Sequence, residues 1–246
     1  AAIAQAVYAP EAYSPSDVVC TTTLHAFDAL IAKEADVIFV LAPSAEQRAK
    51  AEAAGVELHF TPIGREAFVF LVGQTNPLDN LATQQIRNVY SGKTAQWATL
   101  GWEDGGKIIA YQRVENSGSQ SGLQRMVMTG LPIQAPQPLP KGLPKGSSSM
   151  MQQVSVSWQG VQPALGFSYR FFATTMFPNP DAKLLQVDGV APTVANIQNG
   201  SYPFIADFYA VTNGPPQGNT KVLIDWITSP PGQAIVAQAG YTPLTN

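Results

Sequence analysis

The sequence predicts an α/β protein with two lobes, each built on a sheet that helices cover. Short apolar runs typical of strands alternate with segments whose apolar residues recur at helical spacing. The 246 residues, 45% of them apolar, are enough for two lobes of about 100–150 residues each. Only 13% of the residues are charged, and 20 Gly and 20 Pro are spread along the chain as turn residues. This composition is typical of a folded globular protein.

The N-terminal part predicts the order strand, helix, strand, helix, strand. Asp36–Leu41 is a continuous apolar run, of the kind that is buried on both faces of a parallel sheet. Ser44 precedes an Ala-rich helix, and Gly55 ends it. The elements expected here are the tail of a helix at Ala1–Tyr8, a strand at Val18–Cys20, a helix from Leu24, a strand at Asp36–Leu41, a helix through Ala54 and a strand at Val56–Thr61.

The alternation continues to the end of the chain. The later strands expected are Ala67–Val72, Lys107–Tyr111, Ala164–Tyr169, Lys183–Val187 and Phe208–Val211. The later helices expected are Gln84–Tyr90 with Thr83 as its cap, Gly122–Met128, Met150–Val156, Lys221–Ile227 and Gly232–Ala239. Such alternation predicts parallel sheets, in which ligands bind at the carboxyl ends of strands, where helix N-termini point. A ligand site is therefore expected in the strand-to-helix turns.

Charge, cysteine content and hydropathy exclude several classes of protein. The net charge is −3 without a basic run, so no nucleic-acid partner is expected. Cys20 is the one cysteine; it cannot form an intramolecular disulfide, and we expect a small buried thiol. No apolar run reaches the roughly 18 residues of a membrane span. Ala1–Val7 lacks the basic start and the length of a signal peptide, so an exported chain would already have lost its signal.

The first candidate turn is Thr21–Thr23, directly before the helix expected from Leu24. Three hydroxyls and several backbone N–H groups without helical partners collect there, which suits an anion by geometry and by the helix dipole. One Thr is enough for ordinary N-capping. Taken alone, this turn therefore favours ordinary capping over an anion site.

The second candidate is the loop between the strand ending at Tyr111 and the helix from Gly122. It contains Arg113 and, after three residues, Ser117–Ser119. Gly118 lets the backbone approach a ligand closely, and the planar guanidinium of Arg113 matches an oxyanion. A solvated Arg in a Ser/Gly-rich surface loop is the alternative. The order strand, Arg, Ser-Gly-Ser, helix favours the ligand site.

Other candidate groups are weaker. Ser44 and Ser147–Ser149, with Ser148 as the candidate ligand, are hydroxyl residues at expected helix starts, where simple capping is the favoured explanation of each taken singly. His25 and His59 are far apart in sequence and have no Cys/His cluster around them, so we expect no metal and no cofactor. The chain contains no GxSxG, Walker or GxGxxG motif. We therefore expect no catalytic residues and no enzymatic activity.

Several motifs in one order resemble the PstS-like phosphate-binding proteins of ABC importers, which have the type II periplasmic-binding-protein fold. The resemblance covers nearly the whole chain from about Val18. The matching stretches are Ile63–Phe70, Asn76–Leu78, Gln85–Lys93 with Trp97, Arg113 with Ser117–Ser119, Ala164–Phe167, Asp188–Thr193, Tyr202-Pro203, Ser229–Gly232 and Gly240–Leu244. Each stretch is weak by itself, and their common order is specific.

The resemblance implies a lobe 1 made of residues 1–71 and 171–246 and a lobe 2 made of residues 72–170, joined by crossovers near Phe70–Gln74 and Tyr169–Phe172. Each lobe would hold a parallel or mixed sheet, with the ligand cleft between the lobes. It implies an anion held by helix N-termini of both lobes. The implied ligands are Thr21, Thr22, Thr23, Ser44, Arg113, Ser117, Gly118, Ser119 and Ser148. The implied protein is an extracytoplasmic monomer, periplasmic or a cell-surface lipoprotein. It captures phosphate by hinge closure and delivers it to the membrane permease of an ABC importer.

The sequence departs from the family pattern in two places. The family's first strand and its Ser/Thr-rich anion loop have no counterpart, because the chain begins inside the following helix. Many phosphate binders also place an acidic residue after the second strand of lobe 1, where this chain has Leu41–Ser44. These departures favour the alternative of a sensor or interaction module with altered or lost oxyanion binding. An enzyme such as a hydrolase is the third hypothesis, and the lack of a nucleophile–base pair argues against it.

Overall fold

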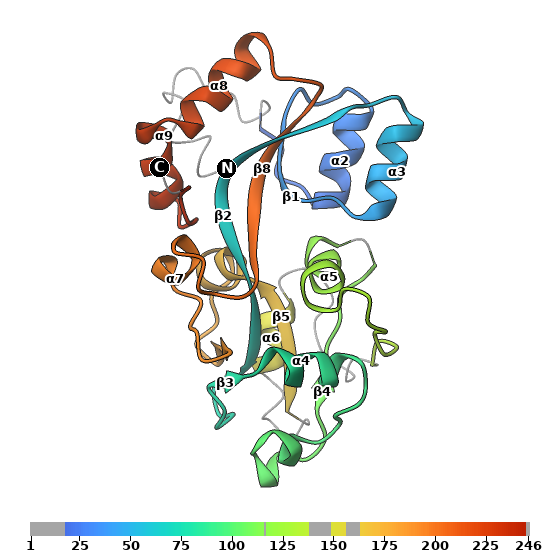
Figure 1. Cartoon of the computed structure of the whole chain (residues 1–246), viewed down its shortest axis with the longest axis vertical. Helices are drawn as coiled ribbons and strands as arrows, with labels where there is room; N and C mark the ends of the chain where they lie inside the picture. The colour runs from blue at the N-terminus through green and yellow to red at the C-terminus, as the bar shows by residue number, and fades with distance from the viewer. Residues whose placement is uncertain (1–17, 116, 138–148, 156–162, 245–246) are drawn as a thin grey trace. The chain divides into compact units, whose positions relative to one another are not determined.

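The computed structural model describes residues 18–115, 117–137, 149–155 and 163–244 (Figure 1). These residues form two compact units. Unit 1 holds residues 18–66, 117–118 and 206–244, and unit 2 holds the described residues of 67–115 and 119–205. The return to unit 1 lies between Ile205 and Ala206, which differs from the expected crossover near Tyr169–Phe172. Residues 171–205 belong to unit 2 because strands within 182–187 pair with strands of that unit.

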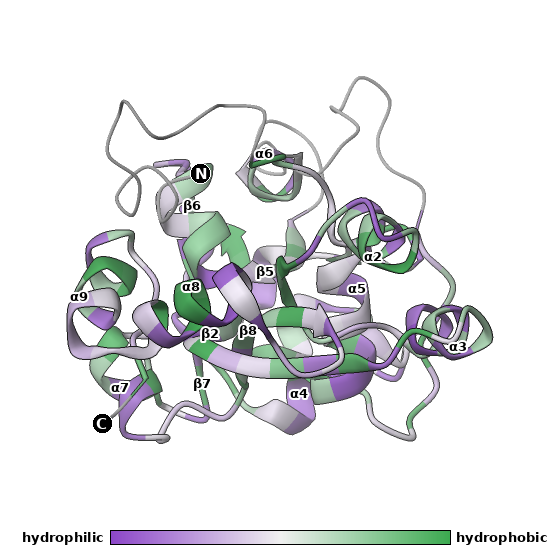
Figure 2. Ribbon diagram, turned by 90° about the horizontal axis from the view of Figure 1, so that it is seen from above, coloured by the Kyte–Doolittle hydropathy of each residue, from purple (hydrophilic) through white to green (hydrophobic). Residues whose placement is uncertain are grey.

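Unit 1 is a small sheet with helices on both faces. Its strands are β1 (Ile38–Leu41), β8 (Ile205–Asn213, from Ala206) and the first part of β2 (Leu58–Gly73). Its helices are α2 (Thr23–Ile31), α3 (Ala45–Ala53), α8 (Gly218–Thr228) and α9 (Pro230–Gln238). The strand order is β1-β8-β2, with β1 antiparallel to β8. Hydrophilic and hydrophobic residues are interleaved along α2 and α3 (Figure 2), as in helices with one buried face.

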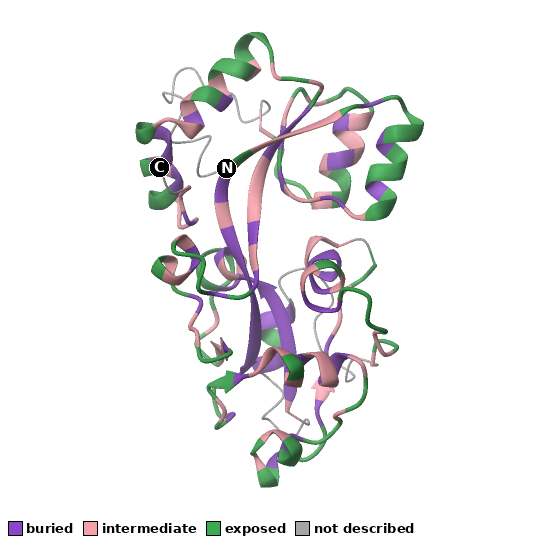
Figure 3. Cartoon of the chain, in the orientation of Figure 1, coloured by how far each residue is buried: buried purple, intermediate pink, exposed green. Residues whose placement is uncertain are grey.

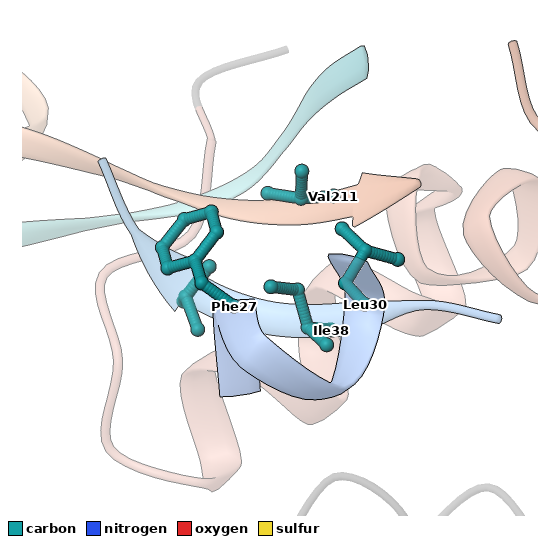
Figure 4. Packing of buried hydrophobic residues seen from close by; sticks show 5 residues of the cluster. Phe27, Leu30, Ile38 and Val211 are labelled. Carbon is teal, nitrogen blue, oxygen red and sulfur yellow. The ribbon is translucent and has the colours of Figure 1, made fainter. Parts of the chain in front are cut away.

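The two sides of strand β8 explain this layering. Val211 packs with Phe27 and Leu30 of α2 and with Ile38 of β1 (Figure 4). The preceding residue, Ala210, packs with apolar side chains of α8 and α9. Because successive residues of a strand point to opposite faces, α2 covers one face of the sheet while α8 and α9 cover the other.

Unit 2 is built around strands that are buried along their length. Its strands are the rest of β2, β3 (Asn80–Leu81), β4 (Ile109–Ala110), β5 (Ala164–Tyr169), β6 (Ala182–Leu184) and β7 (Gln186–Val187). Its α-helices are α4 (Thr83–Tyr90), α5 (Gly118–Gly122, from Ser119), α6 (Ser149–Ser155) and α7 (Val194–Gln198). A π-helix, Leu123–Val127, follows α5, and another spans Phe172–Met176. All six residues of β5 and the adjoining part of β2 are buried (Figure 3).

The pairing of strands is mixed and not purely parallel, within the expectation of a parallel or mixed sheet in each lobe. β4 pairs parallel with β5, and β3 with β7, but β2 pairs antiparallel with both β5 and β6. The run expected at Asp36–Leu41 forms the edge strand β1 and is not buried on both faces, since Phe39 is 36% exposed. The strands expected at Val56–Thr61 and Ala67–Val72 are two parts of the single strand β2.

Three local expectations are wrong, and two lie outside the described residues. Val18–Cys20 forms no strand, and the Cys20 thiol is exposed instead of buried; Val19 is 78% exposed, so this stretch packs on no sheet. Thr83 does not cap α4, because it is the first helical residue; its hydroxyl donates to the Asp188 carboxylate at 2.6 Å. The helix tail expected at Ala1–Tyr8 and the candidate ligand Ser148 fall outside the described part of the chain.

Candidate functional site

The Thr turn, Thr21–Thr23, lies at the start of the nine-residue helix α2. Thr22 is the N-cap, and its hydroxyl accepts from the backbone N–H of His25 at 3.3 Å. The Thr21 hydroxyl lies 3.4 Å from Nδ1 of the same histidine. Thr21 and Thr22 are exposed, and Thr23 is half-buried. Capping therefore occupies the oxygen of one of the three hydroxyls, and the turn presents several donor groups at a helix start.

Ser44 caps the neighbouring helix, α3, which packs beside α2 (Figure 1). Its hydroxyl accepts from the Gln47 N–H at 3.2 Å, and its own N–H donates to Oε1 of Gln47 at 2.8 Å. The expected cap is confirmed and is a full capping box. A hydroxyl oxygen that accepts can still donate its own hydrogen. Capping and anion binding are therefore compatible at Ser44.

The Arg113 loop, residues 113–119, follows strand β4 and leads into α5. The Arg113 side chain is half-buried, and its backbone N–H donates to Oε1 of Gln120 at 2.9 Å. Burial lowers the pKa of the Arg113 guanidinium, because the charged form loses hydration. A partly desolvated cation is stabilised by an anionic partner more strongly than a fully hydrated one.

Unit 1 brings part of this loop against the Thr turn. Gly118 is so close to Thr23 that a Cβ atom at Gly118 would lie 3.0 Å from the Thr23 hydroxyl oxygen. Ser117 belongs to the same unit, while Ser119 belongs to unit 2. Two Ser/Thr/Gly segments that are far apart in sequence thus lie side by side.

The sequence prediction missed the glutamines that hold the Arg113 loop. Gln120, which is 3% exposed, donates to Oε1 of Gln112 at 3.1 Å, and Gln112 donates to the backbone carbonyl of Gln134 at 2.8 Å. Gln112 and Gln120 directly flank the loop. An amide side chain at each end of a predicted anion loop was therefore the available signal.

Other features of the described residues do not add to these turns. The described residues contain no group of three or more His, Cys, Asp or Glu side chains suited to a metal ion. None of their helices is long and apolar enough to span a membrane. A pocket in unit 2 is lined by Met151 and by residues within 173–184, with no charged side chain among them. It contains none of the expected ligands and does not suit an anion.

Comparison with known proteins assigns the family. The family model described as "PBP superfamily domain" matches residues 3–231. The chain belongs to the PBP superfamily. Its sequence is 26% identical to the phosphate-binding protein PstS of Bacillus subtilis (strain 168) over 184 residues, which cover 73% of this chain and 57% of that protein. It is 44% identical to phosphate-binding protein PstS 2 of Streptococcus agalactiae over 69 residues, or 28% of this chain and 24% of that one.

Solved structures support the same fold for this PBP-superfamily chain. A protein of Clostridium perfringens whose crystal structure contains bound phosphate matches with a TM-score of 0.70 at 23% identity, over 90% of this chain and 84% of that one. An ABC-type phosphate transport receptor of Vibrio cholerae matches with a TM-score of 0.65 at 20% identity, over 91% and 85% of the two chains. These matches confirm the predicted α/β fold of the periplasmic-binding-protein type. The aligned part of the chain spans little more than half of its Bacillus subtilis relative.

Proposed function

We propose that this chain is the extracytoplasmic solute-binding protein of an ABC importer. It captures inorganic phosphate, or a related oxyanion, by hinge closure and delivers it to the membrane permease as a monomer. It performs no covalent chemistry. The PstS names of its relatives and the phosphate in the Clostridium perfringens structure support this proposal.

The approach of Gly118 to Thr23 is the observation that carries the proposal. In this proposal, hydroxyls of Thr21–Thr23 and Ser117 and the N–H groups at the start of α2 serve as donors for the oxyanion. A glycine at the contact leaves the backbone accessible to a small ligand.

Arg113 is the charge partner in this proposal. Its guanidinium can donate two parallel hydrogen bonds to a tetrahedral oxyanion, which a lysine cannot do. Ser44, Ser119 and Ser148 complete the proposed ligand set, and hydroxyl donors of this kind can rotate to suit the anion.

A second candidate function follows from the turn after β1. Residues Leu41–Ser44 contain no carboxylate, and a carboxylate is a suitable acceptor for the proton that distinguishes hydrogen phosphate from sulfate. This observation favours a sensor or interaction module that keeps the fold and has altered its ligand.

The deciding experiment is titration calorimetry of the folded chain with phosphate and with sulfate, for the wild type and for Arg113→Ala. We expect the wild type to bind phosphate. We expect Arg113→Ala to lose affinity on the order of 100-fold or more, because the wild-type guanidinium would bind the anion in a partly desolvated environment.

The matched control is Arg125→Ala, which removes an exposed guanidinium from unit 2 and should bind as the wild type does. Normal binding by a folded Arg113→Ala variant would show that the ligand set is wrong. A folded wild type that binds neither anion, yet binds a protein partner, would support the sensor function. Turnover of a phosphate ester would contradict both.

A further inference from the structure

A chain of glutamine side chains closes the Arg113 loop at its base. Oε1 of Gln120 accepts from the backbone N–H of Arg113 at 2.9 Å, and Nε2 of Gln120 donates to Oε1 of Gln112 at 3.1 Å. One buried amide therefore joins α5, where the loop ends, to two successive residues where it begins. Its carbonyl oxygen accepts one bond and its NH2 group donates another, which fixes the orientation of the amide.

The far end of this chain is anchored in the core of unit 2. Gln112 donates to the carbonyl of Gln134 at 2.8 Å. Gln134 in turn donates from its backbone N–H to the carbonyl of Tyr90 and from Nε2 to the carbonyl of Val89, both at 2.9 Å. Val89 and Tyr90 are buried residues of α4. The base of the loop is thus tied to a helix that has no part in the proposed ligand set.

The helix that carries Gln120, α5, is held as firmly as the base of the loop. A Cβ atom at Gly122 of α5 would lie 2.5 Å from the Tyr169 hydroxyl and 2.8 Å from Cε2 of Phe68. Such distances mean that the backbone of α5 rests directly on side chains of β5 and β2. Gln120 therefore has little freedom to move with the loop, and it acts as a fixed point.

We propose that Gln120 is a positioning residue, which holds Arg113 in place for the oxyanion before any ligand arrives. The inference rests on the proposed function. A loop that is ordered in advance loses less conformational entropy when the ligand binds, and a preformed arrangement of donors therefore binds more tightly. Gln120 need not contact the ligand, since its amide is already used by Arg113 and Gln112.

The first test is amide hydrogen exchange of the ligand-free wild type. The Arg113 N–H should exchange at least on the order of 100-fold more slowly than an unstructured amide, because opening requires the bond to Gln120 to break. Exchange of this amide at the unstructured rate would overturn the inference. This measurement needs neither a variant nor a bound anion.

The second test compares Gln120→Met with Gln84→Met. Gln84 is an exposed residue of α4 whose side chain donates to Asn88 of the same helix. Its replacement is therefore the same chemical change at a residue that does not hold the Arg113 loop. We expect Gln120→Met to bind phosphate about tenfold more weakly, with faster exchange confined to residues 113–119. We expect Gln84→Met to match the wild type in both respects.

The outcomes separate the two proposals. If the wild type binds phosphate and Gln120→Met binds it equally well, the positioning role is wrong while the proposed function stands. Faster exchange throughout unit 2 would also overturn it, because that result would indicate a general loss of stability. If the wild type binds neither anion, the proposed function fails, and the exchange of the Arg113 amide still decides whether Gln120 holds the loop. Should Gln120→Met not fold, Gln112→Met removes the acceptor that orients the Gln120 amide and should also weaken binding, while equal binding by a folded Gln112→Met variant would overturn the inference.

Discussion

The Thr turn and the Arg113 loop are rich in the same small polar residues, but they are held in different ways. The side-chain hydroxyls of the Thr turn make two long contacts to His25, at 3.3 and 3.4 Å, and two of its three residues are exposed. The Arg113 loop is tied to the buried Gln120 at 2.9 Å, and Gln120 lies on a helix packed against aromatic side chains.

This difference matches the kind of donor that each segment offers. A hydroxyl rotates about its C–O bond and can adapt to a ligand, so it needs little support. A guanidinium is planar and donates in a fixed direction, so its position must be set in advance. In the proposed ligand set, Arg113 is thus the donor of fixed direction, and the Thr turn offers adaptable donors. Substitutions in the two segments should therefore have different effects.

The largest expected effect on stability comes from Gly122→Ala. The added methyl group would overlap the Tyr169 hydroxyl and the Phe68 ring, and overpacking of this kind destabilises a protein by about 1–3 kcal/mol. Urea unfolding measures the change. Gly118→Ala is the matched control, because its methyl group would meet only the Thr23 side chain, at 3.0 Å. Equal losses of unfolding free energy in both variants would mean that α5 is packed no more tightly than the segment beside the Thr turn.

A smaller effect is expected from Thr22→Ala. The substitution removes the N-cap of α2, which should lower the free energy of unfolding by about 1 kcal/mol. Thr21→Ala removes a neighbouring exposed hydroxyl that does not cap the helix, and should change it by less than about 0.5 kcal/mol. Thermal unfolding of the two variants checks this. If Thr21→Ala is the more destabilising of the two, the Thr turn is held by contacts other than the cap.

Sequence reasoning succeeded where local physics decides the structure. The helix from Leu24 and the cap at Ser44 follow from apolar spacing and from a hydroxyl placed before a helix, and both are present. The break between α8 and α9 at Ser229 is equally local: its hydroxyl caps α9. The expected ligand set is different, since the assignment of Thr23 or Arg113 to an anion stays a prediction.

Sequence reasoning failed where contacts with residues distant in the sequence decide the structure. Val18–Cys20 has the composition of a strand but no partner strand among the described residues. Thr83 has the composition of a cap, but it is the first helical residue, and the Asp188 carboxylate, far along the chain, accepts from its backbone N–H and its hydroxyl. The role of Gln120 also depends on long-range packing, because nothing local shows that its side chain turns back toward Arg113.

The smallest effect is expected from Tyr111→Phe, just before the Arg113 loop. The buried Tyr111 hydroxyl has no hydrogen-bond partner in the described part of the chain, and burial raises its pKa to about 12. Removing a hydroxyl without a partner should leave stability at neutral pH unchanged or raise it by up to about 1 kcal/mol. Tyr202→Phe is the matched control: that hydroxyl donates to the Phe68 carbonyl at 3.1 Å, so its loss should lower stability by about 1 kcal/mol.

The pH dependence of Tyr111→Phe separates burial from a missed partner. The pKa of a tyrosine in an unfolded chain is about 10, and the folded value is higher, so the stability that Tyr111 contributes by staying neutral is present below pH 10 and is lost as the pH rises toward about 12. The wild type should therefore lose more stability than Tyr111→Phe over that range, measured by urea unfolding at several pH values. A destabilised Tyr111→Phe variant at neutral pH would mean that the hydroxyl has a partner. In that case one more polar contact holds the strand that leads into the Arg113 loop. The Arg113 loop would then be held more firmly, relative to the Thr turn, than the hydrogen bonds of Gln120 alone indicate.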